Sequence, residues 1–108
     1  MANGMVKFSV KLALLSESDG GRRTPIENGF RTDLLFRDGE YRMSVFEFNQ
    51  NLLFPEQSIE AICTVLLHSE AEVDHCLALK KTIIADGSNV IGNVEILDVL
   101  GREDVIWQ

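Results

Sequence analysis

The chain has 108 residues, which is the size of one domain, and it is long enough to bury a core of its own. A composition of 45% hydrophobic and 25% charged residues excludes wholesale disorder. The formal net charge of −7 argues against general binding of nucleic acids or acidic membranes. Residues 1–42 hold 7 Lys and Arg against 6 Asp and Glu, whereas residues 43–108 hold 3 against 11, so only the N-terminal part has room for a basic surface.

Apolar and polar residues alternate along the first half of the chain, which is the pattern of half-buried strands. Every even position of residues 6–14 is apolar. A polar loop over 16–29 carries several turn signals and leads to a strand over 30–37. Asp38-Gly39 predicts a two-residue hairpin turn, because both residues tolerate positive φ, and residues 41–48 form the return strand.

Further strands are predicted in the middle of the chain. A break at 49–51 and a short apolar step at 52–54 precede a strand over 58–67, whose odd positions share one face. Residues 69–74 are interpreted as an acidic turn, with at most one turn of helix between Ser69 and His75. The apolar residues of 76–85 then predict another strand.

The last predicted strand covers residues 90–100 and follows a turn at 86–89. Gly92 inside it indicates a bulge or a close approach of another segment. We expect a single domain over residues 1–108, with loose termini at 1–5 and 101–108. About six short strands at steady spacing predict an all-β fold, a closed barrel or a sandwich.

The two cysteines and the apolar stretches bear on location. Cys63 and Cys76 lie in apolar surroundings and are interpreted as reduced core residues. No apolar run of signal-peptide type follows Met1, and the longest apolar stretch, 61–67, is too short to span a bilayer. We therefore expect a cytoplasmic protein.

Motifs for chemistry are weak. The segment Gly20-Gly21-Arg22-Arg23 lacks the lysine and spacing of a phosphate-binding loop, so we expect no nucleotide hydrolysis. Cys63, His68, His75 and Cys76 offer metal ligands, but their spacing fits no zinc pattern, and core thiols with solvated histidines are the preferred interpretation. No nucleophile-elbow motif accompanies the histidines. We expect a non-enzymatic protein that needs no cofactor.

Adjacent Arg22 and Arg23 make the loop over 20–25 the most distinctive segment. Two guanidinium groups after two glycines suit the binding of phosphates or carboxylates. Exposed charges more often serve only solubility, so the residues by themselves favour a solvated hairpin loop.

Several segments of the chain together resemble the third domain of elongation factor Tu. The opening strand ends in Leu-Ser, and Gly-Gly-Arg-Arg-Thr-Pro is similar to the family's Gly-Gly-Arg-His-Thr-Pro. The matching segments, within about residues 6–100, are 7–16, 20–25, 28–31, 35–37, 53–56, 66–68 and 86–92. The resemblance implies a six-stranded closed antiparallel β-barrel.

In that family the domain contacts the T-stem of aminoacyl-tRNA. Carried over onto this sequence, the contacting positions are Arg22, Arg23, Asp86, Gly87 and His68. The chain departs from the family pattern at three of the tRNA-facing places. Arg23 replaces a histidine, Thr32-Asp33 replaces Pro-Gln, and Ser88-Asn89 replaces Gly-Arg.

Three functions follow from these observations. The first is a protein-interaction module on an elongation-factor-Tu-like barrel, translation-related as a decoy, regulator or immunity-type protein, with an unidentified protein partner. The second is docking of tRNA or other RNA through Arg22, Arg23 and Arg31. The third is self-association, because a freed domain exposes surface that its relatives bury.

Overall fold

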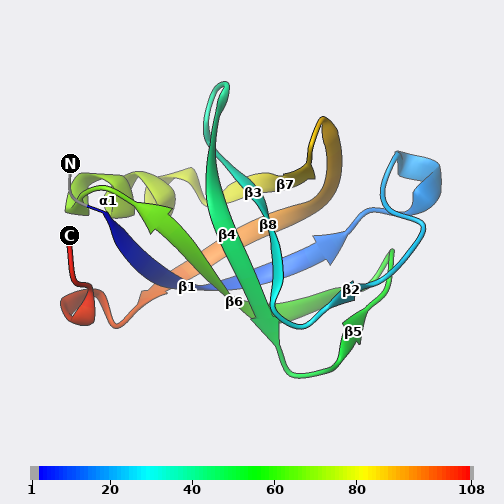
Figure 1. Cartoon of the computed structure of the whole chain (residues 1–108), viewed down its shortest axis with the longest axis horizontal. Helices are drawn as coiled ribbons and strands as arrows, with labels where there is room; N and C mark the ends of the chain where they lie inside the picture. Colours follow the sequence, from blue (N-terminus) through cyan, green and yellow to red (C-terminus); the bar gives the residue numbers. More distant parts are fainter. Residues whose placement is uncertain (1–2, 108) are drawn as a thin grey trace.

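The computed structural model describes residues 3–107 and forms a closed barrel of six antiparallel strands (Figure 1). The barrel strands are β1 (Gly4–Leu14), β3 (Phe30–Arg37), β4 (Glu40–Phe48), β6 (Ser58–Leu67), β7 (Lys81–Asp86) and β8 (Asn89–Leu100). Their order is β1-β6-β4-β3-β7-β8, and β8 pairs back onto β1. The predicted all-β class and the six-stranded antiparallel barrel are confirmed.

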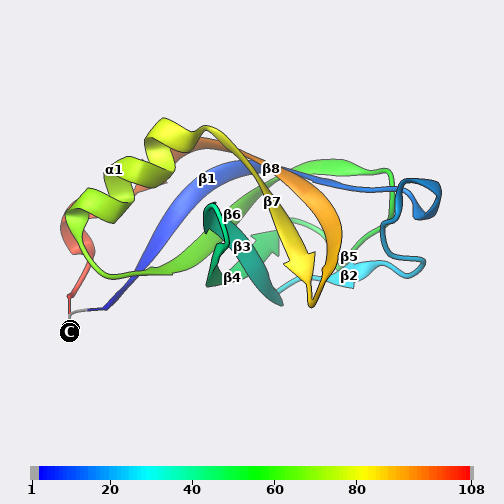
Figure 2. The ribbon, with the colours of Figure 1, turned by 90° about the horizontal axis from the view of Figure 1, so that it is seen from above.

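The connection of the first four barrel strands is a Greek key. Strands β3, β4 and β6 follow one another in the chain and lie side by side in the barrel. The long connection from β1 to β3 leaves β1 on the other side of β6, next to the last of the three. Strand β1 is paired along both edges over most of its length, because residues 4–13 pair with β6 and residues 7–14 pair with β8. Figure 2 shows β1 and β8 on one side of the barrel and β3 and β4 on the other.

Alternation places the side chains as expected. The even residues of β1 point inward and are buried, and on β6 the odd positions 61–67 are buried with Ile59 half-buried beside them. The predicted strands over 30–37 and 58–67 have the same bounds in the structure. The structure extends the first strand back to Gly4, which is itself buried.

Three glycines lie where the backbone has positive φ or where another segment comes too close for a side chain. Gly39 and Gly87 lie in the two tight hairpin turns with φ of 73° and 64°. Gly92 lies in β8 where a Cβ would come within 2.9 Å of the Ala13 carbonyl oxygen. The close approach predicted at Gly92 is therefore confirmed.

The segment after β6 is a helix, α1 (Glu70–Leu79), and here the sequence-based prediction is wrong. An acidic turn over 69–74 and a strand beginning at Cys76 were expected, with one turn of helix at most. Strand β7 begins only at Lys81, after Lys80 has ended the helix with φ of 62°.

Local signals explain why this segment is helical. The Ser69 side chain accepts from the Glu72 backbone N–H, which is the first half of a capping box. Glu72 reaches back to accept from the His68 N–H at 2.7 Å. Val73 and Cys76 are three residues apart, lie on one helical face and are buried in the core. The expected strand instead rested on the apolar residues of 76–85, of which 76–79 belong to the helix.

Short elements close the two ends of the barrel. Strands β2 (Ile26–Glu27) and β5 (Leu52–Leu53) form a separate two-stranded ribbon, and Ile26 and Leu53 are buried in the core. The long polar loop contains a 3-10 turn, η1 (Glu17–Asp19), and the chain ends after η2 (Arg102–Asp104). The segment 101–107, expected to be a loose tail, packs against the core through Val105 and Trp107.

Candidate functional site

The arginine loop over residues 20–25 lies at one end of the long axis of the barrel (Figure 1). Its Arg22 side chain is held by its own chain. The Nη1 atom lies 3.5 Å from Asp86 Oδ2, and Nη2 donates to Thr24 Oγ1 at 3.1 Å. The guanidinium carbon is 5.2 Å from the centroid of the Phe30 ring. With 26% of its side chain exposed, Arg22 presents only part of its charge to solvent.

Arg23 has a different partner from its neighbour. Its Nε donates to Glu17 Oε1 at 3.1 Å, and the side chain is 83% exposed. Exposed ion pairs of this kind contribute little stability, so Arg23 is able to exchange Glu17 for another anion. Both arginines of the loop nevertheless face a carboxylate of the chain itself.

Arg31 and Gly87 belong to the same end. Asp33 of β3 pairs with Ala85 of β7, and the Thr32 hydroxyl donates to the Ala85 carbonyl oxygen at 2.8 Å, so Arg31 and Gly87 flank this contact in sequence. Arg31 is exposed, and no ion pair within residues 3–107 includes it. A hollow of about 300 Å³ nearby is lined by Arg22, Pro25, Ile26, Glu27, Asn28, Gly29 and Phe30. Five of the six candidate residues thus gather around this end.

His68 lies apart from them. It follows β6 and precedes α1, at the opposite end of the molecule from the arginine loop (Figure 1). Its backbone N–H donates to Glu72, and its Nδ1 is hydrogen bonded to Asn3 Oδ1. The structure therefore does not bring His68 into one site with the arginines.

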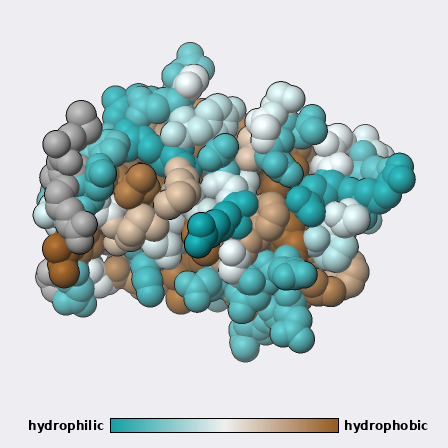
Figure 3. All heavy atoms as spheres, in the orientation of Figure 1, coloured by the Kyte–Doolittle hydropathy of each residue, from teal (hydrophilic) through white to brown (hydrophobic). Residues whose placement is uncertain are grey.

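A second candidate surface, which sequence reasoning did not locate, lies on the outside of β1, β4 and β6. We call it the outer face, and it consists of Met5, Tyr41, Met43, Val45, Ile62 and Leu66. The exposed fractions of its side chains include 46% for Tyr41, 44% for Met5 and 42% for Met43. Figure 3 shows brown and tan spheres among teal ones on the left half of this view, with further brown spheres in the centre and at the lower right.

Strand registers show how the residues of the outer face neighbour one another and their polar surroundings. Met5 pairs with Leu66 across β1 and β6, and Val45 pairs with Thr64 across β4 and β6. On β3, next to β4, Asp33 pairs with Met43, and Arg31 pairs with Val45. The apolar residues therefore have a charged border along β3, and no ion pair of the described chain includes either of these two charges.

An ion-pair cluster ties α1 to the β3–β4 hairpin. Arg42 points inward from β4 and meets Glu72 in a two-pronged contact, with Nη1 to Oε1 at 3.0 Å and Nη2 to Oε2 at 2.7 Å. Its Nε also donates to Glu40 at 3.0 Å, and its guanidinium carbon lies 4.4 Å from the Phe36 ring centroid. Arg37 adds a 3.6 Å contact to Glu72.

The side chains of this ion-pair cluster are largely buried, which indicates that they stabilise the fold. The Arg42 and Glu72 side chains are only 10% and 14% exposed. Burial raises the pKa of Glu72, but the hydrogen bonds from Arg42 and from the His68 N–H outweigh it, and the pKa lies below its usual value. Burial lowers the pKa of Arg42, and the hydrogen bonds to Glu72 and Glu40 more than reverse this. The pair is therefore charged, and it fixes the helix rather than awaiting a ligand.

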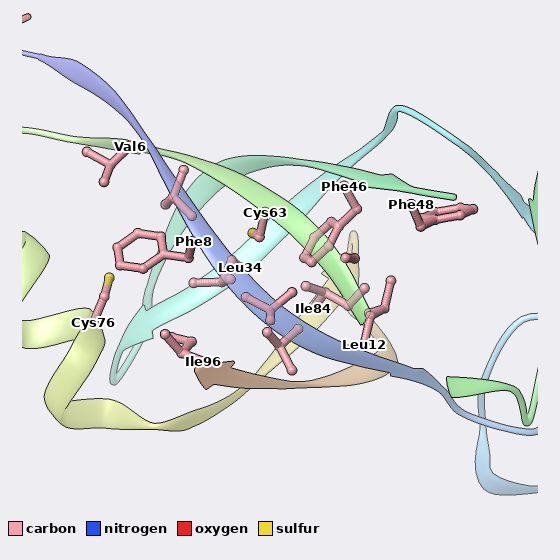
Figure 4. Packing of buried hydrophobic residues seen from close by; sticks show 14 of the residues in the cluster. Val6, Phe8, Leu12, Leu34, Phe46, Phe48, Cys63, Cys76, Ile84 and Ile96 are labelled. Atoms are coloured by element: carbon pink, nitrogen blue, oxygen red, sulfur yellow. The ribbon is translucent and has the colours of Figure 1, made fainter. Parts of the chain in front are cut away.

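His75 is half-buried, and the two thiols are buried. His75 Nε2 donates to the Phe36 carbonyl oxygen at 2.7 Å, and its ring lies 4.6 Å from the Phe36 ring. Figure 4 shows Cys63 pointing into the barrel from β6, and Cys76 reaching from α1 toward Phe8. Burial raises the pKa of both thiols, for Cys76 to about 12 with a further contribution from the Glu72 charge. Both cysteines are free and buried, in agreement with the core interpretation.

The described part of the chain, residues 3–107, offers no group of three or more His, Cys, Asp or Glu that suits a metal ion. A hollow of about 440 Å³ there is lined by Ser9, Asn28, Glu47, Phe48, Asn49, Glu60, Ala61 and Ile62. It has two carboxylates and neither a histidine nor a cysteine. Within the same residues, no helix is both long enough and apolar enough to cross a membrane.

Comparison with protein families and with curated proteins gave no match. No protein-family model matches the chain, and no curated protein matches it either. The function therefore has to be inferred from the surfaces described above.

Proposed function

We propose that this chain is a non-catalytic protein-interaction module that binds its partner through the outer face. The observation that carries the proposal is the set of six apolar side chains at outward positions of the neighbouring strands β1, β4 and β6, three of them more than 40% exposed. A soluble domain seldom leaves such a patch uncovered without a partner. An apolar centre with a charged border, rich in Met and Tyr, is also typical of protein interfaces.

The arginine loop supports RNA docking less well. Arg22 and Arg23 already face Asp86 and Glu17, so a phosphate would have to displace a carboxylate at each position. The net charge of −7 opposes the approach of RNA. The gathering of Arg22, Arg23 and Arg31 at one end is the observation in favour, and it keeps tRNA as the alternative ligand.

The finer proposal is that the barrel is related to the third domain of elongation factor Tu and works beside the translation apparatus in the cytoplasm, as a decoy, regulator or immunity-type protein. Support comes from the resemblance of the segments over 20–25 and 86–92, together with the Arg22–Asp86 contact that joins them. The resemblance implies that these two segments lie on the same surface.

A pull-down that reads proteins and RNA from one eluate tests the proposal. The tagged chain is compared with Met43→Asp, which places a charge in the outer face, and with Leu97→Asp as the matched control. Leu97 is 48% exposed on β8 and lies outside the outer face. We expect the bound protein to be lost with Met43→Asp and retained with Leu97→Asp.

The alternative is judged in the same experiment. Replacing Arg22 and Arg23 by Glu tests RNA docking, because each lost phosphate contact reduces the salt dependence of binding. Enriched tRNA that disappears with this variant, with no effect of Met43→Asp, would replace the interaction module by the RNA-docking function.

A further inference from the structure

The hollow of about 440 Å³ adjoins the outer face, because Ile62 belongs to both. We call it the acidic hollow, since Glu47 and Glu60 line it and both side chains are exposed. Glu47 pairs with Ile62 across β4 and β6, and Glu60 precedes Ile62 by two residues on β6. The two carboxylates therefore project from the same side of neighbouring strands, as diagonal neighbours.

The path of the chain after β4 leaves the acidic hollow open. Phe48 and Ala61 form the last pair between β4 and β6, and residues 49–51 then lead away to β5. The Asn28 side chain holds the end of β4, since its Oδ1 accepts from the Phe48 backbone N–H at 2.9 Å. Strand β4 thus provides no pairing partner for Glu60, and the space beside this residue is the hollow.

The carboxylates of the acidic hollow are not neutralised by the chain. No ion pair within residues 3–107 includes Glu47 or Glu60. Lys11 of β1 lies across the ladder from Glu60, but it also lies across from Glu95 of β8, so its charge is shared between two carboxylates. An arginine or lysine side chain from outside is the group that two such carboxylates bind best.

We propose that the outer face and the acidic hollow together bind one segment of a partner protein, which places large apolar side chains on the outer face and an arginine or lysine in the acidic hollow. The inference rests on the proposed function and adds the chemistry of the partner. Charge complementarity selects the basic residue, and the exposed apolar side chains select apolar ones. Residues 43–108, which supply most of both surfaces, hold 3 Lys and Arg against 11 Asp and Glu, so their field also favours the approach of a basic segment.

Strand β6 sets the distance between the two parts of such a segment. Leu66 of the outer face lies four residues from Ile62 and six residues from Glu60. At about 3.3 Å per strand residue, the apolar part and the basic side chain should be about 13–20 Å apart. That distance corresponds to about four to six residues in an extended segment and about nine to thirteen in a helix.

Selection from a peptide library tests this chemistry. Random peptides of about 16 residues, which cover both lengths, are displayed on phage and panned on the native chain. We expect the enriched peptides to share an arginine or lysine at the stated distance from large apolar residues. The most enriched peptide is then synthesised, and its Kd is measured by fluorescence anisotropy. The double variant Glu47→Lys/Glu60→Lys should weaken its binding at least about tenfold, because attraction becomes repulsion at two positions.

Two controls separate the acidic hollow from general charge effects and from misfolding. The double variant Asp38→Lys/Glu56→Lys changes the net charge equally at exposed positions outside both surfaces, and we expect it to alter the Kd by less than about twofold. Replacing the basic residue of the peptide by glutamate should abolish binding to the native chain and restore binding to Glu47→Lys/Glu60→Lys. This recovery excludes misfolding of the variant as the cause of the loss.

Three results would overturn the inference. These are a selection that enriches no peptide, enriched peptides without a basic residue, or a Kd that Glu47→Lys/Glu60→Lys changes no more than the control variant does. If Met43→Asp still abolishes binding of the peptide or capture of a protein, the outer face remains the interaction site and only the basic chemistry fails. If Met43→Asp affects neither the peptide nor the captured protein, the proposed function fails together with the inference.

Discussion

Replacing Glu72 by Gln tests whether the contact between α1 and the β3–β4 hairpin holds the barrel end together. Glutamine keeps the shape of the side chain and an acceptor for the His68 N–H, but it removes the charge that faces Arg42 at 2.7 and 3.0 Å. Both side chains are at most 14% exposed, so solvent screens the contact little. A hydrogen bond to a charged group contributes about 1.5–3 kcal/mol.

The expected loss is about 2 kcal/mol, because Arg42 retains Glu40 and the Phe36 ring. For a domain of this size such a loss corresponds to a fall in Tm of about 10 °C. Thermal unfolding followed by circular dichroism at pH 7 measures it. The control is Glu60→Gln, an exposed residue of β6, for which we expect less than about 0.5 kcal/mol.

The pH dependence of this difference has a defined sign. The pKa of Glu72 is lowered in the folded chain, so the stabilisation is fully present above the usual glutamate pKa of about 4.3 and is lost as the pH falls through the lowered value. The gap in stability between the native chain and Glu72→Gln should therefore shrink below about pH 4. Equal Tm values for Glu72→Gln and Glu60→Gln at pH 7, or a gap that persists unchanged at pH 2, would refute the reasoning.

Three more predictions follow from local contacts. Ser69→Ala removes the side-chain cap of α1 and should cost about 1 kcal/mol in chemical unfolding, whereas Ser69→Asp should cost far less because Asp also caps. Gly92→Ala should cost about 2 kcal/mol or more in the same assay, because its Cβ meets the Ala13 carbonyl oxygen at 2.9 Å, and stability equal to the native chain would contradict that close approach. Cys63 and Cys76 should react with a thiol reagent at pH 8 only after denaturant is added, and fast labelling of the native chain would show that the burial assigned to them is wrong.

For much of the candidate site, the sequence shows which residue types are present but not which side chains contact one another. The loop arginines Arg22 and Arg23 stand out in the sequence, but their carboxylate partners are 64 and 6 positions away, and only the fold brings Asp86 to Arg22. Arg42 lies at an inward position of β4, where alternation predicts an apolar residue, and this misfit was the available signal for the buried cluster. The spacing Ser69-x-x-Glu72 was the available signal for α1.

The sequence by itself determined most of the barrel strands and their turns. Side chains of a strand alternate between two faces, and glycine adopts positive φ without strain, so the strand over 58–67 and the hairpin at Asp38-Gly39 are encoded by neighbouring residues. The tertiary structure decided the helical state of residues 70–79, because Val73 and Cys76 gain their burial only against β-strands distant in the chain. It also decided the outer face, since Met5 meets Leu66 only through the register of β1 on β6, and such pairings depend on the free energy of the whole barrel rather than on any local segment.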